Sequence, residues 1–267
     1  MTAEPFHDDG QITLYCGEFQ SVELVAGSAA AVVTSPPYNA GIQYVDSDDA
    51  LDWPYYWSMA GDAAALMATA LVEGGRAWVN TAVAVPEDLE GNETVKARVM
   101  LAGRWAMALE MAGLTLVDQV AWCSARGSGT AWGSWCSPAA PNLRGDWESI
   151  LVACRGGWER VPPEGWADWR DGVGNWQSLC STVWRLAPAP RDGSHPTPFP
   201  LELARRAIRL STWPGETVLD LFAGSGTTLL AARQLGRRAI GIELCEHYCD
   251  HAVRRLAQTS LDFEGAA

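Results

Sequence analysis

An apolar segment, Val218-Leu219-Asp220-Leu221-Phe222, runs directly into the turn Ala223-Gly224-Ser225-Gly226. A short, mainly apolar run that stops at a turn predicts a buried strand, and residues 227–235 that follow have the pattern of a helix. Glycine allows the backbone to turn sharply and lets a ligand approach it without meeting a Cβ atom. The first turn of a helix also leaves amide N–H groups unpaired. The segment therefore predicts a strand–turn–helix unit that binds a ligand at its turn.

The residues around this turn restrict what the ligand can be. A dinucleotide fingerprint requires a third glycine where this chain has Leu229, and a phosphate-binding P-loop requires Gly-Lys-Ser/Thr, which this turn does not contain. The next predicted strand, residues 239–243, ends in Glu243. A carboxylate at the end of the second strand, about 20 residues beyond the glycines, can accept both ribose hydroxyls. A nucleoside ligand without a pyrophosphate is expected.

The same alternation of short apolar strands and longer helices extends along the chain and predicts an α/β fold with a doubly wound, mostly parallel, Rossmann-like sheet. Residues 124–146 and 156–194 are rich in Gly, Pro and Trp, and an irregular structure is expected there. The predicted strands are residues 31–34, 76–81, 116–122, 149–153, 218–222 and 239–243, and the predicted helices are residues 54–72, 94–111, 200–210, 227–235 and 246–256.

A second turn, Thr34-Ser35-Pro36-Pro37-Tyr38, follows the first of these strands. The residue types in this turn suit a reaction at an exocyclic amino group. Such an amine on cytosine or adenine is a poor nucleophile because its lone pair is delocalised into the ring. Two hydrogen-bond acceptors aimed at its N–H groups would draw the nitrogen towards tetrahedral geometry and free the lone pair. Ser35 has a hydroxyl oxygen, the prolines fix the backbone so that the Pro36 carbonyl can point rigidly, and Tyr38 has a face on which an extruded base can stack.

Together these segments resemble the S-adenosylmethionine-dependent DNA amino-methyltransferases. Residues 220–228, Asp-Leu-Phe-Ala-Gly-Ser-Gly-Thr-Thr, and Gly241-Ile-Glu243 look like motifs I and II, and residues 195–200, His-Pro-Thr-Pro-Phe-Pro, look like the motif that precedes them. Ser35-Pro-Pro-Tyr38 resembles motif IV, and its position before the cofactor motifs is typical of the beta class. The resemblance implies a methyltransferase fold with a small target-recognition insertion. It implies catalytic roles for Ser35, Pro36, Pro37 and Tyr38, and binding of S-adenosyl-L-methionine by Glu18, Thr34, His195, Pro196, Thr197, Asp220, Phe222, Ala223, Gly224, Ser225, Gly226, Thr227, Thr228, Glu243 and Leu244.

The target base is less strongly specified than the reaction. Ser35, the first residue of the Ser-Pro-Pro-Tyr motif, together with the segment at 195–200 looks more like N4-cytosine members of the family. The N6-adenine members more often carry Asp at the first position of that motif. Methylation of adenine N6 or of an RNA base by the same geometry remains an alternative, and so does a catalytically silent DNA-binding relative. A C5-cytosine enzyme would need a cysteine nucleophile, and none of the seven cysteines lies in this turn.

The partner that the resemblance implies is double-stranded DNA, although the net charge is −13. Residues 121–215 differ from the rest, because they contain 10 arginines, 8 acidic residues and 10 of the 14 tryptophans. Arginine and aromatic side chains are suited to DNA contact. We expect residues 1–155 and 195–260 to be the catalytic and cofactor-binding halves of one domain, and residues 156–194 to read the DNA sequence. The candidate DNA-binding residues are Arg160, Trp166, Trp169, Arg170, Trp176 and Arg185.

The remaining expectations concern the environment of the protein. An odd number of scattered cysteines favours reduced thiols, and no apolar run is long enough to cross a membrane, so a cytoplasmic protein without a membrane partner is expected. The cysteines and histidines between 245 and 251 lack metal-binding spacing, and no metal is predicted. The acidic loop at residues 46–52 is expected to be a mobile, solvated flap near the active site. A homodimer and an accompanying restriction endonuclease are compatible with the sequence, and the chemistry requires neither.

Overall fold

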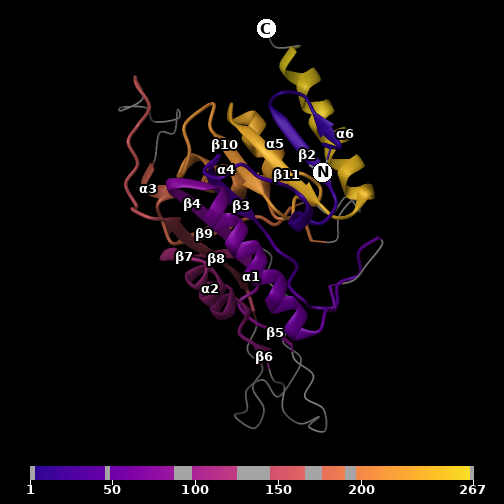
Figure 1. Ribbon diagram of the computed structural model, residues 1–267, viewed down its shortest axis with the longest axis vertical. Coiled ribbons are helices and arrows are strands. Elements are labelled where there is room, and N and C mark those ends of the chain that lie inside the picture. The colour runs from indigo at the N-terminus through magenta and orange to yellow at the C-terminus, as the bar shows by residue number, and fades with distance from the viewer. Residues whose placement is uncertain are drawn as a thin grey trace.

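A computed structural model of the protein describes residues 4–45, 49–86, 98–124, 145–165, 176–189 and 197–264. A nine-stranded sheet dominates the described chain, in the order β1-β2-β11-β10-β3-β4-β8-β7-β9 (Figure 1). Its strands are β1 (His7–Asp8), β2 (Ile12–Cys16), β3 (Ala29–Thr34), β4 (Leu71–Thr81), β7 (Leu114–Ser124), β8 (Trp147–Arg155), β9 (Val183–Leu186), β10 (Thr217–Asp220) and β11 (Arg238–Glu243). The other elements are η1 (Phe19–Ser21), α1 (Trp53–Ala70), α2 (Leu101–Met111), α3 (Trp176–Leu179), α4 (Leu201–Arg209), α5 (Thr227–Gln234), α6 (Glu246–Glu264) and the small pair β5 (Val85–Pro86) and β6 (Arg98–Val99).

Most neighbouring strands in the centre of the sheet are parallel. β2, β11, β10, β3 and β4 pair in parallel, whereas β8 is antiparallel to both of its neighbours and β1 is antiparallel to β2. Helix α1 connects β3 to β4, and α5 connects β10 to β11, so these two parallel pairs are each joined by a helical crossover. The predicted doubly wound, mostly parallel sheet is confirmed.

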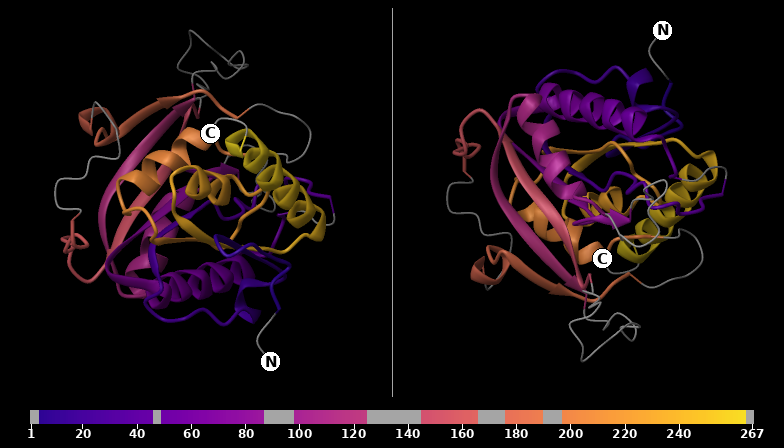
Figure 2. Two further views of the ribbon diagram at one scale, coloured as in Figure 1. Left: turned by 90° about the horizontal axis from the view of Figure 1, so that it is seen from above. Right: turned by 90° about the horizontal axis from the view of Figure 1, so that it is seen from below.

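Helices cover both faces of this sheet, and each face has its own apolar core (Figure 2). Alternate residues of β3 divide between them: Ala31 and Val33 pack in the core that α4, α5 and α6 cover, whereas Val32 packs in the core beneath α1 and α2. This division follows from the period of two along a strand. It also explains why β3 is buried along its whole length.

The strands outside the centre of the large sheet, including the separate pair β5 and β6, depart from the sequence-based expectations. Residues 98–99 were expected to lie in a helix, but they pair with β5 as β6, because this pairing buries Val99 against Val85. Residues 176–186 were expected to be irregular. Instead they form α3 and β9, and β9 pairs with β7 because Trp184 is fully buried and stacks on Trp78. No strand was expected at residues 7–16, where β1 and β2 extend the other side of the sheet.

Strands β3 and β10 lie side by side, and the chain leaves their carboxyl ends in opposite directions. From β3 it leads to α1 on one face, and from β10 it leads to α5 on the other. In open α/β sheets such a switch point forms a crevice where ligands bind. The Ser-Pro-Pro turn and the glycine turn both begin here. Among the described residues, no helix combines the length and apolar character that crossing a bilayer requires.

Candidate active site

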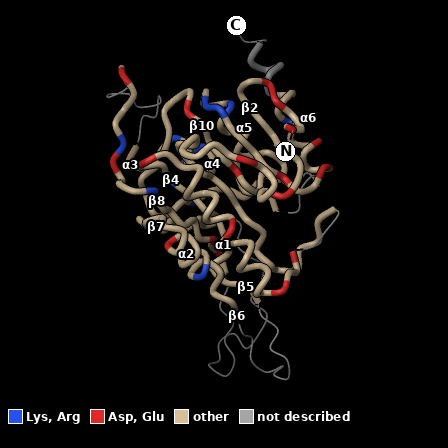
Figure 3. The backbone as a smooth tube through the Cα atoms, viewed as in Figure 1, with Lys and Arg blue, Asp and Glu red and all other residues tan. Residues whose placement is uncertain are grey.

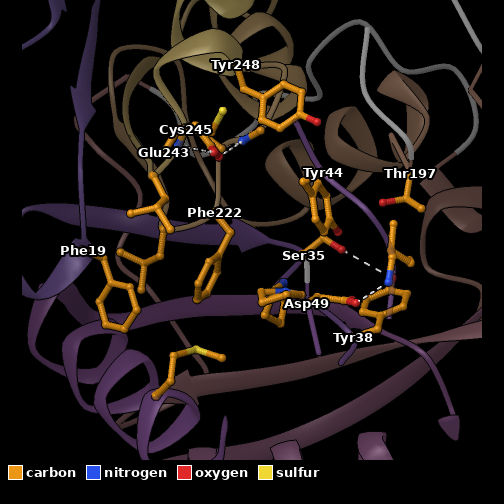
Figure 4. A pocket seen from close by; sticks show the side chains of 18 of the residues that line it. Phe19, Ser35, Tyr38, Tyr44, Asp49, Thr197, Phe222, Glu243, Cys245 and Tyr248 are labelled. Carbon is orange, nitrogen blue, oxygen red and sulfur yellow. Dashed lines mark hydrogen bonds between the residues drawn. The ribbon is translucent and has the colours of Figure 1, made fainter. Parts of the chain in front are cut away.

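A cavity of about 350 Å³ opens at the carboxyl ends of β2, β3, β10 and β11 (Figure 4). Four segments that are far apart in the sequence contribute its walls, together with individual residues from α1 and α6. These segments are residues 17–20, 35–38, 221–225 and 243–245. The topology therefore brings the two turns that the sequence analysis singled out into one site.

The glycine turn is joined to the end of β3 through Asp220. Thr34 donates its hydroxyl hydrogen to Asp220 Oδ1 at 2.7 Å, and the Phe222 backbone N–H donates to the same atom at 3.1 Å. Thr228 donates to the Val33 carbonyl at 3.2 Å, which fixes the start of α5 against the same strand. Asp220 is fully buried, and burial raises its pKa to about 6. These residues lie beneath the cavity and hold its two turns in register.

Glu243 is positioned to bind a ligand at the end of β11. Its Oε2 accepts the Gly224 N–H at 2.7 Å and its Oε1 accepts the Cys245 N–H at 2.9 Å. Burial raises the pKa of Glu243, although these two backbone bonds act in the opposite direction. A carboxylate oxygen can accept more than one hydrogen bond. Both oxygens can therefore also accept hydroxyl groups, as a ribose diol requires, and the site fits a nucleoside.

Aromatic rings line the cavity on either side of Glu243. Phe19 and Phe222 pack edge to face with 5.5 Å between ring centroids, and Tyr44 and Tyr248 pack similarly at 6.3 Å. In Figure 4, Phe222 and Phe19 lie on one side of the cavity, and Ser35 and Tyr38 lie on the other. Rings at both ends suit a site that holds two flat heterocycles, one in the nucleoside half and one beside the Ser-Pro-Pro turn.

The Ser-Pro-Pro turn is supported from beneath by buried polar side chains. The Tyr56 hydroxyl donates to the Pro37 carbonyl at 2.7 Å, and the Trp105 indole N–H donates to the Tyr56 oxygen at 3.0 Å. Tyr56 and Trp105 are both fully buried. The turn is thus held by hydrogen bonds as well as by the fixed φ angles of its prolines. Ser35 and Pro36 line the cavity above it.

Tyr38 contacts two polar residues that the sequence analysis did not assign to the site. Its hydroxyl donates to Glu148 Oε2 at 2.7 Å and accepts the Asn80 amide N–H at 2.7 Å. Glu148 directly precedes the predicted strand at residues 149–153, and no role at the site was predicted for it. Asn80 had no distinguishing signal, because its relevance depends on β4 and β8 being neighbours.

Asp49 also lines the cavity, so the acidic loop lies near the site as expected, but this residue is buried and not solvated. It is 3% exposed, and its Oδ1 accepts the Ile42 N–H at 2.5 Å. Its Oδ2 is buried and has no hydrogen-bond partner among the described residues. This oxygen is available to an N–H donor of a bound ligand.

Most of the sequence-predicted residues lie together at this site. Those that line the cavity are Glu18, Ser35, Pro36, Pro37, Tyr38, Thr197, Phe222, Ala223, Gly224, Ser225, Thr227, Glu243 and Leu244. Those that do not line the cavity but lie in the same strand ends and turns are Thr34, Asp220, Gly226 and Thr228. The predicted residues His195, Pro196, Trp166, Trp169 and Arg170 lie outside the described residues.

Three of the candidate DNA-binding residues are described, and they lie apart from the cavity. Trp176 begins α3, and Arg185 is an exposed residue of the outermost strand, β9. Arg160 lies near the amino end of β10, whereas the cavity lies at the carboxyl end of that strand. There it forms an ion pair with Glu216, donates to the Ser211 carbonyl at 2.9 Å and packs over the Trp213 ring. These contacts give Arg160 a structural role, which the sequence could not show because Glu216 lies 56 residues away.

Comparison of the sequence with known proteins finds DNA methyltransferases. The family model N6_N4_Mtase, described as DNA methylase, matches residues 29–254. The type II methyltransferase M.ScaI of Streptomyces caespitosus is 27% identical over 95% of this chain and 84% of that relative. M.Cfr9I of Citrobacter freundii is 48% identical, but over 28% of this chain and 25% of the relative.

A solved structure extends the likeness to the whole fold. The protein TTHA0409 of Thermus thermophilus, complexed with S-adenosyl-L-methionine, superimposes with a TM-score of 0.73 at 25% identity, covering 92% of this chain and 94% of that protein. The family that the sequence motifs predicted is confirmed: the chain belongs to the N6_N4_Mtase family of DNA methylases.

Proposed function

We propose that this protein transfers a methyl group from S-adenosyl-L-methionine to the exocyclic N4 atom of cytosine in a short, specific sequence of double-stranded DNA. The observation that carries the proposal is the arrangement of Ser35 and Pro36 in the same cavity as Glu243 and the glycine turn. The sulfonium of the cofactor is an activated methyl donor. The protein therefore has to bind the donor, position the amine and keep both in register.

Binding of the donor is assigned to the half of the cavity that the glycine turn and Glu243 form. Glu243 accepts the ribose hydroxyls, and the rings of Phe19 and Phe222 pack beside the adenine. The stretch 197–199, which also lines the cavity, reaches the methionine end. TTHA0409, the relative solved with this cofactor, supports the assignment.

Positioning of the amine is assigned to the Ser-Pro-Pro turn. The Ser35 oxygen and the Pro36 carbonyl accept the two N–H groups of the target amine, which draws its lone pair out of conjugation with the ring and towards the methyl group. Because the base must reach this turn from a duplex, it has to leave the helix and enter the cavity. Tyr38 then stacks on its face. No covalent intermediate is formed, and no nucleophilic side chain is needed.

Ser35 favours cytosine as the target, because N4-cytosine members of the family carry Ser at this position more often than N6-adenine members do. Arg185 and Trp176 are proposed to contact the DNA together with the rest of residues 156–194 other than Arg160. Along the part of the backbone visible in Figure 3, basic residues lie at scattered points and form no continuous stripe. Local arginine and aromatic contacts, rather than a broad basic surface, are therefore proposed to hold the duplex.

The test is incubation of the protein with duplex DNA of varied sequence and methyl-labelled S-adenosyl-L-methionine, followed by digestion to nucleosides and mass spectrometry. Label in N4-methylcytosine is expected. Label in N6-methyladenine would overturn the assignment of the base, and no label on any duplex, with the cofactor still bound, would overturn the proposed reaction.

Two variants identify the catalytic turn within the same experiment. Ser35→Ala removes one of the two acceptors and is expected to slow transfer about 100-fold or more, and Tyr38→Ala removes the stacking face. Both are expected to bind the cofactor as tightly as the parent protein does, because neither side chain contacts Glu243 or the glycine turn. Full activity in both variants would contradict the assigned roles.

A further inference from the structure

Tyr38 is held at its hydroxyl end by a closed set of hydrogen bonds that base stacking does not require. Asn80 donates its amide to the Tyr38 oxygen at 2.7 Å and to Glu148 Oε2 at 3.0 Å, while Tyr38 donates to the same carboxylate oxygen at 2.7 Å. Asn80 is at the carboxyl end of β4 and Glu148 at the start of the neighbouring antiparallel β8. Two strands thus place a carboxylate and an amide around one phenol.

The direction of each hydrogen bond in this set follows from the chemistry of the groups. A carboxylate can only accept, so the single phenol hydrogen must point towards Glu148. Burial and the neighbouring carboxylate also raise the pKa of Tyr38 well above its ordinary value, which keeps that hydrogen in place at neutral pH. The Tyr38 oxygen is consequently limited to accepting hydrogen bonds, and one of these comes from Asn80.

This polarity extends to Ser35, whose Oγ lies 3.4 Å from the Tyr38 oxygen. With the phenol hydrogen committed to Glu148, any hydrogen bond between the two hydroxyls must run from Ser35 to Tyr38. The Ser35 lone pairs then remain free to accept an N–H group in the cavity. If the phenol hydrogen could turn the other way, it would occupy a lone pair that the target amine needs.

We propose that Glu148 is a positioning residue that acts through the Tyr38 hydroxyl to keep Ser35 a hydrogen-bond acceptor for the target amine. The inference rests on the proposed amino-methyl transfer, and it assigns Tyr38 a second role besides stacking. A phenyl ring would stack on a base equally well. The two roles can therefore be separated by removing only the hydroxyl.

The experiment compares Tyr38→Phe, Glu148→Gln and the double variant in single-turnover methyl transfer. Each single variant is expected to slow transfer about tenfold, as the loss of one hydrogen bond implies. Affinities for S-adenosyl-L-methionine and for DNA are expected to stay within about twofold, because the cofactor half of the cavity and the DNA-contacting segment are unchanged. The double variant is expected to be no slower than the slower single variant, because Glu148 acts through the hydroxyl that Tyr38→Phe has removed.

Glu110→Gln is the matched control, since Glu110 is an exposed residue near the end of α2 that lines no part of the cavity and lies outside the proposed DNA-contacting segment. It is expected to transfer methyl groups at the parental rate. A parental rate in Tyr38→Phe would overturn the inference, and so would a double variant slowed by the product of the two single effects. Tyr38→Phe removes one oxygen atom and keeps the ring, so it decides the question even if Glu148→Gln folds poorly. Failure of the parent protein to label any DNA would count against the proposed function instead.

Discussion

At the scale of single residues, Asp220 sets a pH dependence for the stability of the whole chain. Burial raises its pKa from 3.8 to about 6, although Thr34 and the Phe222 N–H stabilise its charged form. A carboxyl group whose pKa is higher in the folded state binds its proton more tightly there than in the unfolded state. The free energy of unfolding therefore falls as pH rises from about 4 to about 6, and this contribution is constant above that range. A shift of about two units corresponds to about 3 kcal/mol.

Asp220→Asn is expected to remove this contribution, because Asn cannot ionise and its side-chain oxygen can still accept from Thr34 and Phe222. Urea unfolding at pH 4.5 and pH 7 measures the difference. The variant should lose less stability than the parent protein between these two values. Asp62→Asn, which changes an exposed residue of α1, should retain the parental difference. Equal pH dependence in the parent protein and in Asp220→Asn would show that the carboxyl group is not the source.

At the scale of elements, Gly226 decides how closely α5 can approach α6. Its φ of +76° lies in the left-handed region, and a Cβ atom added there would come within 2.9 Å of the Ala252 Cβ on α6. Gly226→Ala is expected to destabilise the protein by about 1–3 kcal/mol, from backbone strain and overpacking together. It should also weaken cofactor binding, because the turn that carries Gly224 would shift. Thermal unfolding and a cofactor titration measure the two effects.

The chain has a matched glycine that should respond in the opposite direction. Gly103 lies within α2, and an added Cβ there would meet nothing within 4 Å. Gly103→Ala is therefore expected to stabilise the protein by about 0.5–1 kcal/mol. Ala252→Gly should partly restore the stability of Gly226→Ala by removing the opposing Cβ atom. If both glycine substitutions changed stability alike, neither the close approach nor the backbone conformation at Gly226 would be responsible.

Elements with a strong local signal were the ones that the sequence predicted well. The strand and turn from Val218 to Gly226, and the Ser-Pro-Pro turn after Thr34, are defined by residues next to one another, and both were found where expected. The short β9 depends on Trp184 reaching Trp78 across about 100 residues, and Glu148 reaches Tyr38 from 110 residues away. Such pairings follow from the order of strands in the sheet, which no local pattern specifies.

At the scale of the whole molecule, the two ends of the chain contribute interleaved strands to one sheet. β10 lies between β3 and β11, and β11 lies between β10 and β2, so the carboxyl-terminal strands fill the space between strands from the first 34 residues. The catalytic and cofactor-binding segments are therefore parts of one hydrogen-bonded sheet. Neither half is expected to fold without the other, and far-UV circular dichroism and tryptophan fluorescence should report a single, coincident unfolding transition.

Cofactor binding should stabilise this single unit as a whole, because the cavity is lined by residues from both halves, among them Ser35 and Glu243. At about 100 times its dissociation constant, a ligand that binds only the folded state adds about 2.7 kcal/mol. For a chain of this size we expect S-adenosyl-L-methionine to raise the midpoint of thermal unfolding by about 5–10 °C in both probes. Glu243→Gln, which keeps one carbonyl oxygen for the backbone N–H groups but loses an acceptor for the ribose, should show a smaller rise at the same cofactor concentration. A rise confined to one probe would mean that the two halves unfold separately, and an undiminished rise in Glu243→Gln would mean that the ribose is held elsewhere.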